Sequence, residues 1–144
     1  MQLNFGVIDF PYADVAASES VTTGDVAEIL EAKYAIMENF ADHYKKEIAT
    51  MLSDSVSGAL ESLLMGKVPD LDVTAEAASA IKASFSHFLE SREIEGYGID
   101  GVPTKAALAG VSHRFRHPYA KGHPRRPSFI DTGTYESAFI VWVS

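Results

Sequence analysis

The sequence predicts an α+β fold, in which a helix-dominated single domain carries a long N-terminal helix and a small C-terminal antiparallel sheet. The length of 144 residues suits one domain with one core. Apolar residues recur at helical spacing through the first half, and a strand-type apolar run stands near residue 140. We expect an N-terminal arm over residues 1–22, a helical body over 23–115, and a basic loop with a C-terminal strand over 116–144.

The arm begins with a loosely alternating stretch. Over residues 2–8, Leu3, Phe5 and Val7 share one side, which is typical of a short strand or an extended arm. Pro11 and the small polar residues after it predict a loop as far as residue 22. Thr23 is the expected N-cap of the first helix, because acidic residues follow in the positive first turn.

A long helical stripe follows, from Val26 to Gly66. Its apolar residues recur at spacings of three, four or seven, while charged residues occupy the other side. An unbroken helix of this length would measure roughly 60 Å. We therefore expect either a break near residues 53–58 or a helix that projects and packs on neighbouring subunits, with a stop and turn over 66–70.

Shorter elements complete the helical body. The spacing predicts a second helix over residues 74–92 and a third, short helix over 103–115, which Pro118 ends. Residues 94–102 are punctuated by glycine and indicate a loop or an irregular edge strand. Residues 117–127 contain three prolines, so we expect an extended loop there.

The final apolar run, residues 138–143, has strong strand propensity. Its apolar density requires a partner strand, for which residues 2–8 are the candidate. A turn at Asp131, Thr132 and Gly133 precedes it, because Asp starts turns and Gly adopts positive φ.

Charge is strongly segregated along the chain. The net charge is −8, and residues 1–104 hold six Lys or Arg against eighteen Asp or Glu. Residues 105–130, here called the basic segment, contain no acid. Such segregation predicts that the segment meets an acidic partner surface, another copy of the chain or a polyanion. The six cations of the basic segment are Lys105, Arg114, Arg116, Lys121, Arg125 and Arg126.

Two motifs in this region suggest catalysis or metal binding, and both have simpler interpretations. Asp131-Thr132-Gly133 spells the aspartic-protease triplet, but that fold needs most of its strands after the triplet. His113 and His117 have the i, i+4 spacing of zinc ligands, with His123 or a distant acid as the third. The surrounding cations and Pro118 favour ordinary histidines at a helix end. We expect no metal and no cofactor.

The remaining patterns also argue against an enzyme. The absence of cysteine excludes disulfides and a cysteine nucleophile. No phosphate-binding glycine loop, G-x-S-x-G elbow or H-E-x-x-H motif occurs. The residues near Met1 lack a basic signal region, and no apolar run approaches the ~18 residues of a membrane span, so we expect a protein with no membrane contact.

Residues 126–137, RPSFIDTGTYES, resemble a segment of small tailed-bacteriophage morphogenesis proteins. These are tail-completion, tail-terminator and head–tail joining proteins, which carry R-P, an apolar residue, T-G, an apolar residue and S in this order. The pattern resembles the family over residues 103–143. Family members often continue with further strands after T-G, which leaves open a smaller neck component. The resemblance implies a structural virion protein that forms a ring between portal and tail.

The resemblance implies a non-enzymatic virion structural protein that is assembled in the host cytoplasm. Its implied partners are other copies in the ring and the portal, adaptor and tail tube, with non-specific DNA as a further contact in the lumen. Asp131, Thr132 and Gly133 would shape the turn that presents the basic loop. The alternative is a phage-encoded nucleic-acid-binding or regulatory protein, because cations and aromatics interleave in that loop. The residues expected to dock the partner are Arg114, Arg116, Lys121, Arg125 and Arg126.

Overall fold

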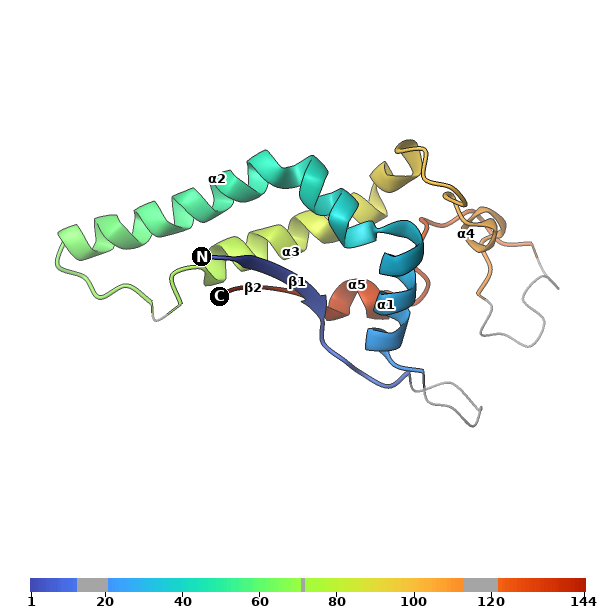
Figure 1. The fold of residues 1–144 in the computed structure, drawn as a ribbon, viewed down its shortest axis with the longest axis horizontal. Helices are drawn as coiled ribbons and strands as arrows, with labels where there is room; N and C mark the ends of the chain where they lie inside the picture. Colours follow the sequence, from blue (N-terminus) through green and yellow to red (C-terminus); the bar gives the residue numbers. More distant parts are fainter. Residues whose placement is uncertain (13–20, 71, 113–121) are drawn as a thin grey trace.

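A computed structural model describes residues 1–12, 21–70, 72–112 and 122–144, and shows an elongated molecule (Figure 1). Helices dominate it, and one two-stranded antiparallel sheet brings residues near the two ends of the chain together, which confirms the predicted α+β class. No helix in the described ranges is long and apolar enough to cross a membrane. The elements are β1 (Leu3–Val7), α1 (Thr23–Tyr34), α2 (Ile36–Leu64), α3 (Ala75–Glu90), the 3₁₀ helix η1 (Glu93–Gly96), α4 (Lys105–Ala109), α5 (Thr134–Ala138) and β2 (Phe139–Val143).

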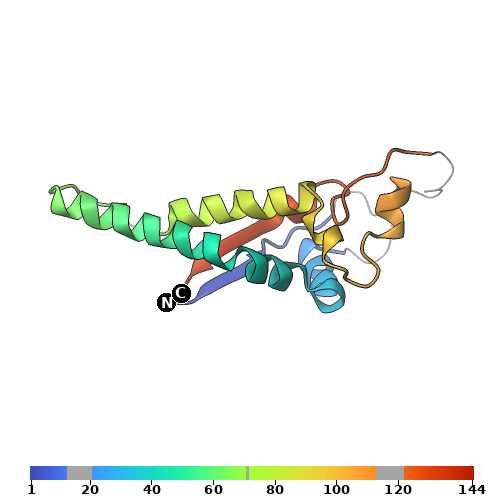
Figure 2. The same ribbon diagram turned by 90° about the horizontal axis from the view of Figure 1, so that it is seen from above.

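The predicted pairing of the arm with the last strand is confirmed. Strand β1 runs antiparallel to β2, with Leu3 opposite Val143 and Val7 opposite Phe139. A two-stranded sheet is marginal by itself in water. Its stability therefore depends on the helices α2 and α3, which lie side by side above it (Figure 2).

The core lies where α2, α3 and the sheet meet, and it is built from phenylalanine rings. Phe40 of α2, Phe85 and Phe88 of α3, and Phe139 of β2 are all 0% exposed. Phe85 stacks on Phe139 with ring centroids 3.9 Å apart, and Phe40 meets Phe85 edge-on at 5.2 Å. Each aromatic pair adds about 0.5–1.5 kcal/mol beyond its buried area. We call this cluster the aromatic junction.

Helix α1 begins one residue earlier than the sequence predicts. Thr22, not Thr23, is the N-cap, and its side chain and that of Asp25 form a capping box. The Thr23 hydroxyl is buried and serves the arm instead. It donates to the carbonyl oxygen of Ile8 and accepts from the backbone N–H of Phe10, both at 2.7 Å.

The long stripe breaks at Ala35 and not near residues 53–58, so of the two expected alternatives the break there is wrong. Ala35 adopts the left-handed conformation, with φ 48° and ψ 50°. The carboxylate of Glu31 stabilises the break because it accepts hydrogen bonds from the backbone N–H groups of Met37 and Glu38, at 2.8 and 3.0 Å. Beyond the break, α2 is continuous over 29 residues and projects past the start of α3 (Figures 1 and 2).

The shorter elements deviate where tertiary contacts intervene. Residues 93–96 form η1 instead of a loop or edge strand, and Glu93 there accepts hydrogen bonds from the Tyr44 hydroxyl at 2.9 Å. Burial, together with this carboxylate, raises the pKa of Tyr44 well above its usual value. Helix α4 ends at Ala109, well before residue 115. Gly110 ends it by adopting the left-handed conformation with φ 64°, and a side chain at this position would also collide with the backbone of Pro124.

Candidate functional site

The two described flanks of the basic segment, residues 105–112 and 122–130, lie against each other at the end of the molecule that carries α4 (Figure 1). The backbone N–H of Arg126 donates to the carbonyl oxygen of Ala107 at 3.0 Å, and Gly110 lies directly against Pro124. The flanks therefore form one braced base for the segment.

Arg126 makes most of the hydrogen bonds that hold the two flanks together. Its Nη1 donates to the carbonyl oxygen of Ile130 at 2.6 Å, and its Nη2 donates to that of Val111 at 2.9 Å. The same guanidinium lies 4.0 Å from the carboxylate of Asp131, which accepts a 2.5 Å hydrogen bond from Ser112. The side chain is 22% exposed. Its charge thus serves mainly to join parts of its own chain.

Arg125 forms a second connection, to the body of the protein. It pairs with Glu95 of η1, whose side chain is 7% exposed. A carboxylate at this depth needs compensation by charge and hydrogen bonds. Ser128 supplies two of these bonds, from its backbone N–H at 3.0 Å and its hydroxyl at 2.9 Å. The Ser128 hydroxyl also accepts from the backbone N–H of Thr104 at 3.2 Å.

The structure brings together some of the predicted docking residues. Arg125 and Arg126 lie at the base with Asp131, while Arg114, Arg116 and Lys121 lie outside the described residues, as do His113 and His117. His123 is exposed, and within the described ranges no group of three potential metal ligands gathers.

The predicted turn has a more specific form than the sequence indicates. The hydroxyl of Thr132 lies 2.7 Å from that of Thr134, within hydrogen-bonding distance. Gly133 has φ 77° and starts the short helix α5, which the sequence did not reveal. Residue 138 therefore ends α5, and the strand begins at Phe139.

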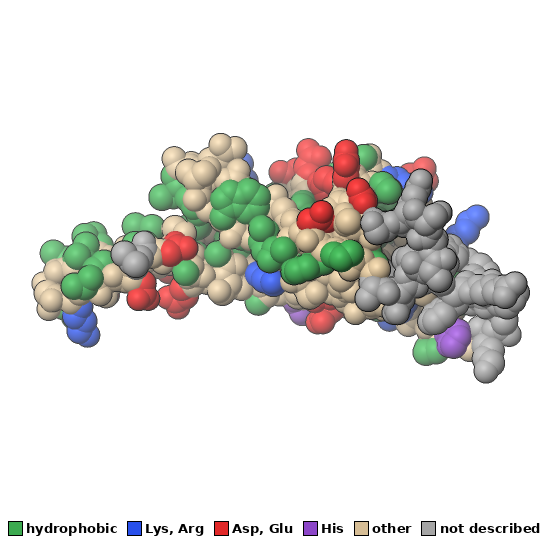
Figure 3. Space-filling view, turned by 90° about the horizontal axis from the view of Figure 1, so that it is seen from below, with side chains coloured by type: hydrophobic (Ala, Val, Ile, Leu, Met, Phe, Trp, Pro, Cys, Tyr) green, Lys and Arg blue, Asp and Glu red, His purple; other side chains and the backbone are tan. Residues whose placement is uncertain are grey.

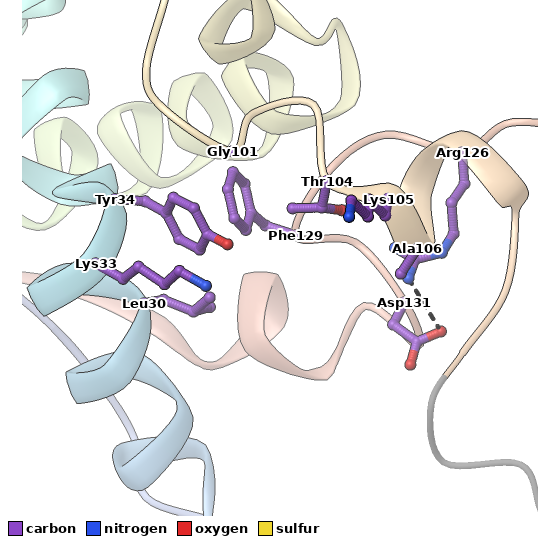
Figure 4. A pocket seen from close by; sticks show the side chains of 10 residues that line it. All are labelled: Leu30, Lys33, Tyr34, Gly101, Thr104, Lys105, Ala106, Arg126, Phe129 and Asp131. Carbon is purple, nitrogen blue, oxygen red and sulfur yellow. Dashed lines mark ion pairs between the residues drawn. The ribbon is translucent and has the colours of Figure 1, made fainter.

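An open pocket of about 520 Å³ lies between α1 and this base (Figure 4). Leu30, Tyr34 and Phe129 form its apolar part, with the Tyr34 and Phe129 rings 5.0 Å apart. Lys33 and Lys105 add ammonium groups to the lining, which also includes Arg126 and Asp131. Cations beside apolar surface suit a protein partner that presents a carboxylate next to an apolar side chain.

Sequence reasoning did not assign Lys33, Tyr34 and Phe129 to a site. One signal was present, because Lys33 interrupts the apolar stripe of the first helix. Its ammonium group lies 5.1 Å from the ring centroid of Tyr34, a cation–π distance. Phe129 gave no signal, since its place opposite Tyr34 depends on a backbone with φ 68°.

A second surface lies at the opposite end, on residues 53–68, here called the α2 tip. Every residue of this stretch is at least partly exposed, and Figure 3 shows hydrophobic side chains gathered over the projecting end. The large apolar side chains among them are between 43% and 94% exposed: Val56, Leu60, Leu63, Leu64, Met65 and Val68.

Comparisons of the chain with protein families, characterised proteins and solved structures found no match.

Proposed function

We propose that this chain is a non-enzymatic virion structural protein of a tailed bacteriophage, acting in head–tail connection or tail completion. It assembles into a ring in the host cytoplasm, and the basic segment docks on an acidic surface of the neighbouring subunit. The observation that carries this proposal is the braced base of the segment, which lies at the end of an acidic body opposite the α2 tip.

The distribution of charge favours contact between unlike surfaces. Acidic side chains are exposed along the helical body, whereas six of the twelve Lys and Arg fall within the acid-free residues 105–130 of the sequence. A positive end that meets a negative flank makes a head-to-tail contact, and such contacts close into rings when the rotation allows. The exposed acids on α2 and α3 include Glu38, Asp42, Glu47, Glu76 and Glu90.

The rival function, binding of nucleic acid, draws less support from the base. Arg125 and Arg126 are occupied by Glu95 and by backbone carbonyl groups. Phosphate binding requires cations that are free to replace counterions. A docking role tolerates such internal bonds, because they hold the segment in place for a partner.

The proposal is tested by charge reversal. The double variant Arg114→Glu with Arg116→Glu should abolish the ring that mass photometry and negative-stain microscopy detect for the unaltered chain. The matched control is Lys45→Glu with Lys46→Glu, which makes the same charge change at exposed positions of α2 and should leave the ring intact. Because exposed ion pairs are screened, high salt should also dissociate the ring.

Three results would contradict assembly through the basic segment. These are a chain that forms no ring at any protein concentration, a ring that survives reversal at Arg114 and Arg116, and equal loss of the ring in the control. A chain that forms no ring but shifts DNA in a gel in a salt-dependent manner would favour the rival function.

A further inference from the structure

We propose that the α2 tip is a self-association surface, on which the tip of a second copy of this chain docks antiparallel about a two-fold axis near Leu64. The inference goes beyond the ring, because the tip and the basic segment lie at opposite ends of the molecule (Figure 1). The two-fold contact at the tip does not depend on whether the chain forms a ring.

The helix at the tip has little support from its own sequence. Ser53, Ser55, Ser57 and Gly58 are weaker helix formers than alanine or leucine. The structure nevertheless continues α2 to Leu64. A helical stretch of this length is marginal in water unless an apolar face is packed.

Its own chain covers a different face of the tip. Ser55, Ala59 and Ser62 follow one another at spacings of four and three, and they line a hollow together with Pro69 and Val73. The hydroxyl of Ser55 donates to the carbonyl oxygen of Val73 at 2.5 Å and so holds the returning chain against this face. The large apolar side chains lie on the neighbouring face, which remains exposed.

The end of the helix is well defined, so the apolar face has a fixed limit. The backbone N–H of Lys67 donates to the carbonyl oxygen of Ser62 at 2.8 Å, and that of Gly66 donates to Leu63 at 2.9 Å. Gly66 adopts φ 75°, which completes a Schellman motif. Leu64, Met65 and Val68 therefore lie exposed at or next to this hydrogen-bonded turn.

The charges at the tip favour a second copy as the partner. The whole chain carries −8, so most of its surface repels another copy. Within the tip the charged residues are Asp54, Glu61 and Lys67, so its net charge is only −1. Glu61 and Lys67 stand three residues before and three after Leu64. An antiparallel pair centred on Leu64 therefore places Glu61 of each copy beside Lys67 of the other.

The exposed area is sufficient for a weak but specific pair. Six large apolar side chains, at roughly 60–100 Å² each, provide about 500 Å² per copy. Two copies would bury about 1,000 Å², which is near the lower limit for a biological interface. The pair should accordingly form at micromolar or higher concentrations and not at nanomolar ones.

The natural absence of cysteine permits a direct test on the full chain. In the single variant Leu64→Cys the two thiols meet at the axis, so diamide, which accepts the two electrons, should convert the protein to a disulfide-linked dimer. The control Thr50→Cys is exposed on α2, about 21 Å along the helix from residue 64. It should form no disulfide-linked dimer, because a disulfide requires Cα atoms within about 7 Å.

A second variant tests the interface without a cross-link. Leu60→Glu with Leu64→Glu should raise the dimer dissociation constant at least about a hundredfold in sedimentation equilibrium, since it removes two large apolar contacts and adds like charges. Hydrogen exchange of residues 56–64 should slow when the unaltered protein is concentrated, while exchange in α3 stays constant.

The outcomes separate this inference from the ring. Absence of a cross-link at Leu64, equal cross-linking at Thr50, or unchanged association in the double variant overturns the two-fold contact. A ring that persists in that variant leaves the proposed function standing. Conversely, a dimer that depends on Leu64 and not on Arg114 or Arg116 supports the two-fold contact even where no ring forms.

Discussion

Helix α2 contributes to two regions of the molecule that differ sharply in what covers their apolar side chains. At the aromatic junction its stripe is covered by α3 and the sheet, and Phe40 is 0% exposed. At the α2 tip Leu60 and Leu64, which lie on roughly the opposite side of the helix from Phe40, are 56% and 80% exposed. The difference teaches that helical periodicity identifies an apolar face but not the surface that covers it.

The two regions contribute to different properties of the protein. The junction supplies the buried area that holds the fold, since its rings contact one another across three elements. The tip adds almost nothing to that core. Substitutions in the two regions should therefore affect different quantities, namely the free energy of unfolding at the junction and self-association at the tip.

The largest effect is expected at the junction. Phe85→Ala should lower the free energy of unfolding by about 3–5 kcal/mol, because it removes a fully buried ring and leaves a cavity. Its counterpart Leu60→Ala should change that free energy by less than about 0.5 kcal/mol. Urea denaturation followed by circular dichroism, at concentrations that keep the chain monomeric, measures both. Equal costs would mean that the tip packs on its own body.

The basic segment also contains one residue that is held by internal hydrogen bonds, Arg126, and one that is exposed, Lys105. Arg126→Gln should lower the free energy of unfolding by about 2–3 kcal/mol, because two charge-assisted bonds to buried carbonyl groups are lost. Lys105→Gln, at an exposed position, should change it by less than about 0.5 kcal/mol. Thermal and urea denaturation provide the comparison. A neutral Arg126→Gln would show that this arginine does not brace the flanks.

The smallest effect concerns the break that directs α2 toward the tip. Ala35→Gly should raise the free energy of unfolding by about 0.5–1 kcal/mol, because glycine adopts the left-handed conformation without strain. The matched substitution Ala41→Gly, within α2, should lower it by about 1 kcal/mol. Calorimetric melting temperatures should move in opposite directions. A loss of stability in both variants would argue that residue 35 is not left-handed in solution.

The sequence predicted the elements that depend on neighbouring residues better than those that depend on residues far along the chain. The helical stripe, the pairing of residues 2–8 with the last strand and the stop at Gly66 follow from local patterns, and the structure confirms them. The end of α4 and the helix α5 were missed. Both depend on contacts with chain far along the sequence or on one glycine conformation, which periodicity does not record.

The candidate site was predictable in charge and not in arrangement. The sequence predicted docking by Arg125 and Arg126 and a turn at Asp131, but it did not show that Glu95 and three backbone carbonyl groups hold the two arginines. Arg114, Arg116 and Lys121 lie outside the described residues, and their role in docking stays a prediction.

The sequence by itself determined the helical content, the partner of the last strand and the separation of a basic segment from an acidic body, because periodicity, propensity and charge are properties of local sequence. The tertiary structure decided that the long stripe breaks at Ala35. There the carboxylate of Glu31 accepts hydrogen bonds from the first backbone N–H groups of α2. The tertiary structure also decided that the Phe40 side of α2 is buried and that Leu60 and Leu64 are exposed. The physical reason is that burial depends on what packs against a face, and that partner comes from elsewhere in the chain or from another molecule.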